Sequence, residues 1–201
     1  MAKTRHSVVT KPFGCDTFHV RSISTGCERY FSSSLTLRIR AGDRKVSLSR
    51  TFRWVHEGDY ATLGDVMFDA VRHGESRYNE RQRAAWAPVA RRGQEWTDRL
   101  RTQDIVLAET SGSVLGFMSL ATGGYIDFAF IQPEAQHTGL FRQLFELVIE
   151  KAGLKGEKLL WVHASLMAEP AFTKLGFAIT KREKVAIGED QFERLEMHRA
   201  L

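Results

Sequence analysis

The chain has 201 residues, 43% of them hydrophobic and 26% charged, a composition typical of globular proteins that excludes disorder throughout. No apolar run approaches the roughly 18 to 20 residues needed to cross a bilayer, so we expect a cytoplasmic protein without a membrane span. The net charge of +5 arises in residues 1–50, which contain ten Lys and Arg and three Asp and Glu. Residues 51–201 contain nineteen Lys and Arg and twenty-one Asp and Glu, so they carry a slight negative charge. The basicity therefore belongs to a leader and not to the domain, which argues against nucleic acid as a partner.

Residues 1–48 form a basic, serine-rich segment that is poor in acids and shows no hydrophobic period. Three explanations stay open for it: a disordered extension, a targeting segment, or translated sequence upstream of the true start. We favour disorder or a misplaced start. Cys15 and Cys27 both lie here, and two cysteines without a second pair do not form a zinc pattern. We expect free thiols, with a disulfide as the alternative, and no metal site.

From residue 49 to the C-terminus the pattern is that of one folded domain. Asp59 is the expected N-cap of its first helix. Gly153 is the expected end of its longest helix, and the apolar run 158–164 predicts a strand that is buried on both faces. In chain order we expect a strand at 49–55, helices near 60–71, 80–86 and 94–100, strands at 105–110, 114–121 and 125–131, a helix at 140–152, a strand at 158–164, a helix at 170–175, and strands at 178–185 and 193–198. This order predicts a mixed α+β fold.

The segment from residue 125 to 144 carries the strongest chemical signal. An apolar strand runs into a short loop, and a helix opens directly after Gly139. The first backbone N–H groups of a helix have no partner inside it, and the helix dipole is positive at that end. Such a place binds phosphate or pyrophosphate without basic side chains. On this loop alone, an ordinary connection between strand and helix is the equal alternative.

Two motifs resemble the GNAT N-acetyltransferase superfamily. Gln136-x-x-Gly139 resembles its coenzyme A pyrophosphate loop, Q/R-x-x-G-x-G/A, and residues 171–177 (AFTKLGF) resemble its F-Y-x-K-x-G-F segment. The AWAP stretch at residues 85–88 is similar to a bacterial subgroup of small GNAT enzymes. The resemblance covers about residues 50 to 199. It implies a GNAT-like α+β (α/β) fold, in which a mostly antiparallel central sheet is flanked by helices and a splayed strand pair binds acyl-CoA.

The resemblance also implies an activity. We expect transfer of an acetyl group from acetyl-CoA, without a metal, to a primary amine of a small molecule or peptide by direct attack in a ternary complex. A homodimer would be in keeping with the family. The positions that the family would use for the cofactor are Phe130, Ile131, Gln136, His137, Thr138, Gly139, Leu140, Phe141, Arg142, Ser165 and Phe172.

Three of these positions depart from the family pattern. Phe141 replaces the last Gly or Ala of the loop, and it would crowd the cofactor unless its ring turns toward the buried side of the helix. Phe172 replaces a frequent tyrosine and has no proton to give to the leaving thiolate. Ser165 replaces a frequent asparagine but keeps a hydroxyl that can bond the pantetheine arm.

Asp127 and His163 are the candidates for accepting the proton of the amine. Asp127 belongs to the strand beside the expected acyl site, and its alternative role is to pair with an arginine or cap a loop. His163 belongs to the facing strand, where a hydrogen-bonded structural histidine is the alternative. His137 lies in the loop and is a better match for phosphate.

Tyr78 and Trp86 are the candidates for the acceptor pocket, because aromatic rings can stack on or cover an amine. Trp96 adds aromatic surface to the same place, and for each of the three a role in the core is the favoured alternative. Glu75 and Glu80 could attract a cationic amine or could be solvated charges at a helix end.

Two other functions compete with the enzyme: a catalytically silent acyl-CoA-binding regulatory module, motivated by Phe141 and Phe172, and an RNA- or membrane-associated protein that uses the basic leader.

Overall fold

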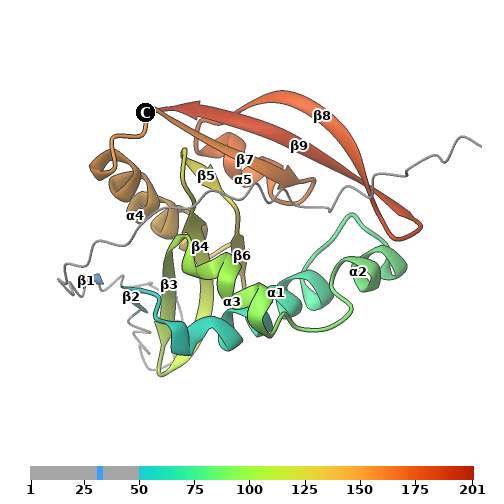
Figure 1. Cartoon of the computed structure of the whole chain (residues 1–201), viewed down its shortest axis with the longest axis horizontal. Coiled ribbons are helices and arrows are strands. Elements are labelled where there is room, and N and C mark those ends of the chain that lie inside the picture. The colour runs from blue at the N-terminus through green and yellow to red at the C-terminus, as the bar shows by residue number, and fades with distance from the viewer. Residues whose placement is uncertain (1–30, 34–49) are drawn as a thin grey trace, which may run out of the picture.

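The computed structural model describes residues 31–33 and 50–201 (Figure 1). The rest of the basic leader, with Cys15 and Cys27, lies outside the described residues, so the expectations for it stay predictions. None of the helices in the described part of the chain is both long and apolar enough to cross a bilayer.

Two sheets form the centre of the domain. One has the strand order β1-β2-β3-β4-β6 and the other β5-β7-β9-β8, and every pair is antiparallel except β5 with β7. The elements are β1 (Phe31–Ser33), β2 (Arg50–Trp54), η1 (Glu57–Asp59), α1 (Tyr60–His73), α2 (Glu80–Trp86), α3 (Gln94–Arg101), β3 (Asp104–Thr110), β4 (Ser113–Leu120), β5 (Tyr125–Ile126), β6 (Ala129–Ile131), η2 (Pro133–Ala135), α4 (Leu140–Leu154), β7 (Leu159–Ser165), α5 (Glu169–Lys174), β8 (Ala178–Ile187) and β9 (Asp190–Ala200).

Strand β3 separates two hydrophobic cores. Val106 and Ala108 pack into a core that includes α4, whereas Ile105 and Leu107 pack into a second core with α1 and α3. All four side chains are buried, as expected for a strand with helices over both faces. The first sheet is therefore covered on both sides, and α4 lies on the opposite side from α1 and α3 (Figure 1).

Strand β7 differs from its prediction. The apolar run 158–164 predicted burial on both faces, but only Leu160, Val162 and Ala164 are buried, while Trp161 and His163 on the other face stay partly exposed. The reason is that α4 and α5 cover a single face of the second sheet. The other face is free to border a pocket.

The predicted strand 125–131 is in fact two strands that belong to different sheets. β5 pairs with β7, and β6 pairs with β4. At the break, the Phe128 amide donates to the hydroxyl of buried Ser119 at 2.9 Å, while the Ser119 amide donates to the Phe128 carbonyl at 2.9 Å. A side chain thus replaces one ladder bond, and the chain can cross from one sheet to the other.

Two helix ends also differ from the prediction. Asp59 makes no side-chain cap to α1, because its carboxylate accepts the His56 amide at 2.8 Å and pairs with Arg53 at 2.7 Å. Helix α4 continues through Gly153 to Leu154. Gly156, with φ of 75°, supplies the left-handed residue after it.

The closing hairpin is longer than predicted and reaches across the molecule. β8 and β9 are joined at Gly188, and the curved hairpin extends from above α5 to α2 (Figure 1). Its tip is held there by an ion pair of 2.6 Å between Arg81 and Asp190, and by the Tyr78 hydroxyl, which donates to the Glu193 carbonyl at 2.7 Å. The hairpin therefore forms one wall of the space between the helices and the second sheet.

Candidate active site

The two sheets diverge where the chain crosses between them. β5 pairs with β7 only at Tyr125 and Ile126, after which β6 follows β4 instead. The Ser119 amide donates to the Phe128 carbonyl at 2.9 Å and the Gln132 amide to the Leu115 carbonyl at 2.8 Å. Antiparallel ladder bonds alternate along a strand, so the backbone groups of Ala129 and Ile131 point to the other edge of β6, into a gap.

Strand β7 forms the other edge of this gap. The Trp161 amide donates to the Gly124 carbonyl at 3.0 Å, and the Leu201 amide donates to the Lys158 carbonyl at 3.0 Å. By the same alternation, the backbone of Ser165 points away from β9 and toward the gap. The splayed strand pair expected from the resemblance is therefore β6 and β7. The backbone of Ala129 was not predicted to face this gap. The backbone of Phe130, which was predicted to bind the cofactor, instead points toward β4.

The loop that opens α4 is held in an unusual backbone conformation. Gly139 has φ of 81° and His137 φ of 58°, both in the left-handed region. The Thr138 hydroxyl donates to the Ala135 carbonyl at 2.6 Å, and the Gln136 amide group donates to the Ile131 carbonyl at 3.3 Å. Among residues 31–33 and 50–201, its chain neighbours apart, no atom lies within 4 Å of where a Cβ would stand at Gly139, so a ligand can approach the backbone closely.

The remaining side chains of this loop are either buried in the core or exposed to solvent. Leu140 is buried in the core, so only its backbone can face a ligand. His137 lies 3.7 Å from Glu75, and Arg142 pairs with Glu146 at 3.0 Å, with all four side chains largely exposed. Sequence reasoning missed Arg50 of β2, whose guanidinium donates to the Thr138 carbonyl at 3.4 Å and to Gln143 at 3.3 Å.

Phe141 turns toward α5 and not toward the loop surface. Its ring meets that of Phe172 edge to face, with centroids 5.1 Å apart. Phe172 is buried and lines the pocket described below. The Ser165 hydroxyl, also in the pocket wall, accepts the Ala168 amide at 3.3 Å. The two phenylalanines therefore pack on each other beside the gap and leave the first turn of α4 open.

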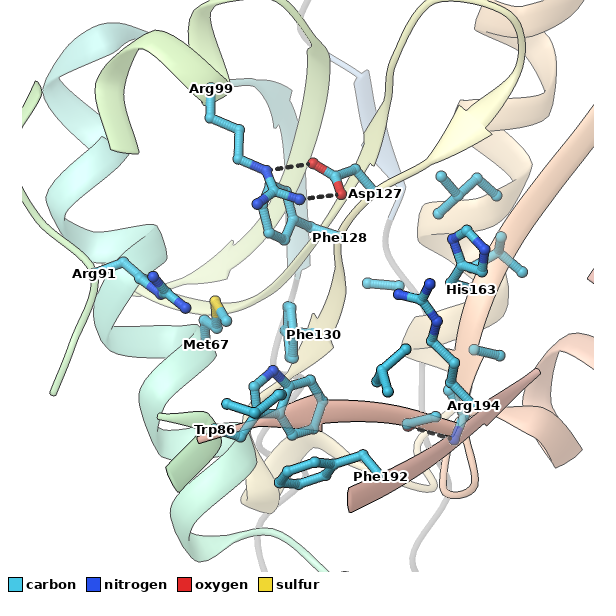
Figure 2. Close-up of a pocket in the computed structure, with 18 of the residues that line it drawn as sticks. Met67, Trp86, Arg91, Arg99, Asp127, Phe128, Phe130, His163, Phe192 and Arg194 are labelled. Atoms are coloured by element: carbon cyan, nitrogen blue, oxygen red, sulfur yellow. Dashed lines mark hydrogen bonds and ion pairs between the residues drawn. The ribbon is translucent and has the colours of Figure 1, made fainter. Parts of the chain in front are cut away.

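A pocket of about 160 Å³ lies between the helices, the β5–β6 crossover, β7 and the closing hairpin (Figure 2). Tyr78 and Trp86 both line it, and their rings meet edge to face at 6.1 Å. Tyr78 is also core, since its ring is buried and its hydroxyl holds the hairpin, and burial raises its pKa. Trp96 lines the pocket too, with its indole N–H bonded to the Tyr60 carbonyl at 2.7 Å.

The carboxylate of Asp127 is engaged by its neighbours. Arg99 donates to both of its oxygens, at 2.6 and 2.9 Å, and Gln103 donates at 2.7 Å. The side chain is only 4% exposed. The alternative of pairing with an arginine is thus what the structure shows, although Asp127 does border the pocket (Figure 2).

The imidazole of His163 faces the pocket from β7. Its Nδ1 lies 3.4 Å from the Tyr125 hydroxyl, and its Nε2 lies 3.6 Å from Glu183 and 3.9 Å from Glu196. Burial and then the positive charge of Arg194 lower the pKa of His163 below 6.5. The ring is therefore neutral at neutral pH, which is the form that accepts a proton.

Several pocket residues were not found from the sequence. Arg91, Arg99, Phe192 and Arg194 all contribute to its wall. Phe192 and Arg194 stand two apart on β9, and this spacing could have placed them on one face. Nothing in the sequence shows that the hairpin curves far enough to bring that face over the helices.

A strand pair that splays beside a glycine-containing helix N-terminus defines an acyltransferase fold of the GNAT type, and the comparisons with known proteins agree. A family model for the acetyltransferase (GNAT) domain matches residues 75–193. The chain belongs to this family. The uncharacterized N-acetyltransferase YafP of Escherichia coli (strain K12) is 30% identical over 129 residues, which cover 64% of this chain and 81% of that protein.

Solved structures show the same fold. A GCN5-related N-acetyltransferase from Rhodopseudomonas palustris matches with a TM-score of 0.68 at 25% identity, covering 75% of this chain and 94% of that one. The putative acetyltransferase yncA from Salmonella typhimurium, solved with its cofactor acetyl-CoA, matches with a TM-score of 0.55 at 20% identity, covering 76% and 94%.

Proposed function

We propose that this protein transfers the acetyl group of acetyl-CoA to a primary amine by direct attack in a ternary complex. The observation that carries the proposal is the presence of three features: the open first turn of α4, the gap between β6 and β7, and the pocket that contains His163. Ala129 and Ser165 belong both to the gap and to the pocket wall. Membership of the GNAT acetyltransferase family supports this assignment. The acetyl-CoA that occupies the structurally similar yncA supports the choice of co-substrate.

The loop residues fit a diphosphate through their backbone. The amides from Gly139 to Arg142 stand at the N-terminus of α4, where a helix leaves its first N–H groups unpaired. In this arrangement Gly139 permits close approach, while His137 and Arg142 reach solvent, and Arg142 adds positive charge near the phosphates. The exposed backbone edges of Ala129, Ile131 and Ser165 then bond the pantetheine arm as an added strand would.

The pocket residues position the amine and provide a base. The amine nitrogen bonds to the thioester carbonyl carbon as the C–S bond breaks, and His163 accepts the proton that the nitrogen loses. Glu183 and Glu196, within 4 Å of Nε2, stabilise the imidazolium once it forms. Phe172 has no proton to donate, so the departing thiolate takes its proton from water. Asp127 positions the crossover through Arg99 and is not the base.

A catalytically silent acyl-CoA-binding module is the second candidate, and Phe172 is the observation that favours it. Calorimetric titration of the full chain with acetyl-CoA and with CoA, followed by thiol release with a panel of primary amines, separates the two. Binding with acetyl-CoA-dependent thiol release supports the transferase. Binding without release on any amine supports the silent module, and absence of binding refutes both.

A further inference from the structure

The charged residues of the pocket wall are unbalanced in sign. Four arginines line it, Arg91, Arg92, Arg99 and Arg194, against two carboxylates, Glu95 and Asp127. Asp127 is already held by Arg99 and Gln103. Glu95 is exposed in the first turn of α3, where the helix dipole favours a negative charge. With His163 neutral, the wall carries a net positive charge.

Arg91 is available to a ligand. Within the described part of the chain, its side chain takes part in no hydrogen bond or ion pair, whereas Arg92 pairs with Asp65 and Arg194 donates to Glu183 at 2.5 Å. Figure 2 shows the Arg91 guanidinium extending toward Met67 at the pocket. A guanidinium in this position can hold a carboxylate through two parallel hydrogen bonds.

Trp86 is a second donor without a partner. Its indole nitrogen is buried, and no acceptor meets it among the described residues. A buried donor left unpaired costs about 1 to 3 kcal/mol, so native proteins rarely keep one without a reason. Trp86 and Arg91 lie on the same side of the pocket (Figure 2), where an oxygen of a bound ligand would be the acceptor that both lack.

The rest of the pocket is apolar and small. The ring of Trp86 lies 6.5 Å from that of Phe130 and 6.4 Å from that of Phe192, and Met67 completes this part of the wall. The volume of about 160 Å³ is similar to the roughly 150 Å³ of an apolar cavity that holds benzene. An apolar group of about that size fits here.

We propose that the acceptor is a small amine that carries a carboxylate at the opposite end of an apolar body, as an ω-amino acid does, with Arg91 binding the carboxylate. The two groups must be separated because Arg91 and His163 lie on opposite sides of the pocket (Figure 2). This proposal rests on the proposed function, because the same pocket must admit the amine. The suggestion from the sequence that Glu75 and Glu80 attract a cationic amine is not supported. Neither residue lines the pocket, and Glu80 already pairs with Arg72 and Arg83.

The test compares ligands that differ only by the carboxylate. Calorimetry of the CoA-loaded full chain should show N-acetyl-4-(aminomethyl)benzoate binding roughly ten- to a hundredfold more tightly than N-acetylbenzylamine, the range expected for a charge-assisted hydrogen bond. Thiol release should show the same preference for 4-(aminomethyl)benzoate over benzylamine in kcat/KM.

Arg91→Met should abolish this preference and leave acetyl-CoA binding unchanged, and Arg91→Lys should restore part of it. Arg101→Met is the matched control, since Arg101 makes an exposed pair with Glu57 outside the pocket, and it should keep the full preference. Equal binding of the two N-acetyl compounds, binding of neither, or a preference that survives Arg91→Met would overturn the proposal. Thiol release with benzylamine would still sustain the acetyltransferase assignment, so the two failures are distinguishable.

Discussion

Gly139 is the residue whose backbone most directly prepares the cofactor loop. Its φ of 81° is unfavourable for any residue with a Cβ, and, its chain neighbours apart, no other described residue comes within 4 Å of the position that a Cβ would take. We expect Gly139→Val to weaken acetyl-CoA binding at least tenfold in calorimetry, because the added side chain occupies the place of the diphosphate.

The matched control is Gly112→Val. Gly112 has φ of 80° and equally open surroundings, but it lies in the turn between β3 and β4. Both substitutions should lower the free energy of unfolding by a similar amount, about 1 to 2 kcal/mol. Only Gly139→Val should affect the cofactor, and equal loss of binding in both variants would mean that strain, not contact, is responsible.

His163 determines the expected pH dependence. Because burial and Arg194 lower its pKa below 6.5, the neutral base persists to lower pH than a free imidazole would. Activity should therefore be retained as pH falls through 6.5 and should decline only below it, where the ring becomes protonated. His163→Gln should lower kcat by roughly 10²- to 10⁴-fold and remove this acidic limb, with little change in KM for acetyl-CoA.

His73→Gln is the control for that experiment. His73 lies at the end of α1 and pairs with Asp69 at 3.3 Å, but it does not line the pocket. Its substitution should leave the pH profile of kcat intact. An acidic limb that persists in His163→Gln would assign the base elsewhere.

At the scale of elements, the pair between Arg99 and Asp127 joins α3 to the β5–β6 crossover. Asp127 is 4% exposed and accepts three hydrogen bonds, so removing its charge leaves Arg99 and Gln103 poorly matched. We expect Asp127→Asn to lower the free energy of unfolding in urea by about 1 to 3 kcal/mol. Asp98→Asn, which removes an exposed pair on the same helix, should cost less than about 1 kcal/mol.

Kinetic constants of Asp127→Asn distinguish a positioning role of Asp127 from a role as the base. If it positions the crossover, Asp127→Asn should alter KM for the amine more than kcat. A variant of unchanged stability that has lost kcat would instead identify Asp127 as the base.

The elements that the sequence predicts well are those with an uninterrupted period. The helix at 140–152 and the strands of the β3–β4 hairpin agree with α4, β3 and β4 to within two residues, because their apolar spacing is local. The break at Asp127 was not predictable. It depends on Ser119, which bonds Phe128, and on Arg99, which bonds Asp127, and only the tertiary structure supplies these partners.

The site was predictable to the same extent and for the same reason. The loop from Gln136 to Arg142 is consecutive in sequence, so a motif could identify it. Arg91 and Arg194 come from a loop and from the last strand, more than 100 residues apart. They line the same pocket only because the closing hairpin crosses the molecule (Figure 1), and no local pattern encodes that curvature.

At the scale of the molecule, the gap between the two sheets is the place where a bound cofactor would join them. The amides of Ala129, Ile131 and Ser165 face this gap, whereas the Phe130 backbone is already bonded within the first sheet. We expect NMR-detected amide exchange to slow markedly at Ala129, Ile131 and Ser165 when acetyl-CoA is added, because the pantetheine arm supplies partners to these edges. Phe130 is the internal control, since it sits between two of the reporting amides.

A rise in protection that is uniform over the domain would have a different cause. Any ligand that binds only the folded state raises global stability by mass action, and that effect slows every amide that exchanges through global unfolding. The alternating pattern along β6, with Ala129 and Ile131 protected more than Phe130, is specific to an arm bound in the gap. Equal changes at all three amides would place the cofactor elsewhere, even if calorimetry showed tight binding.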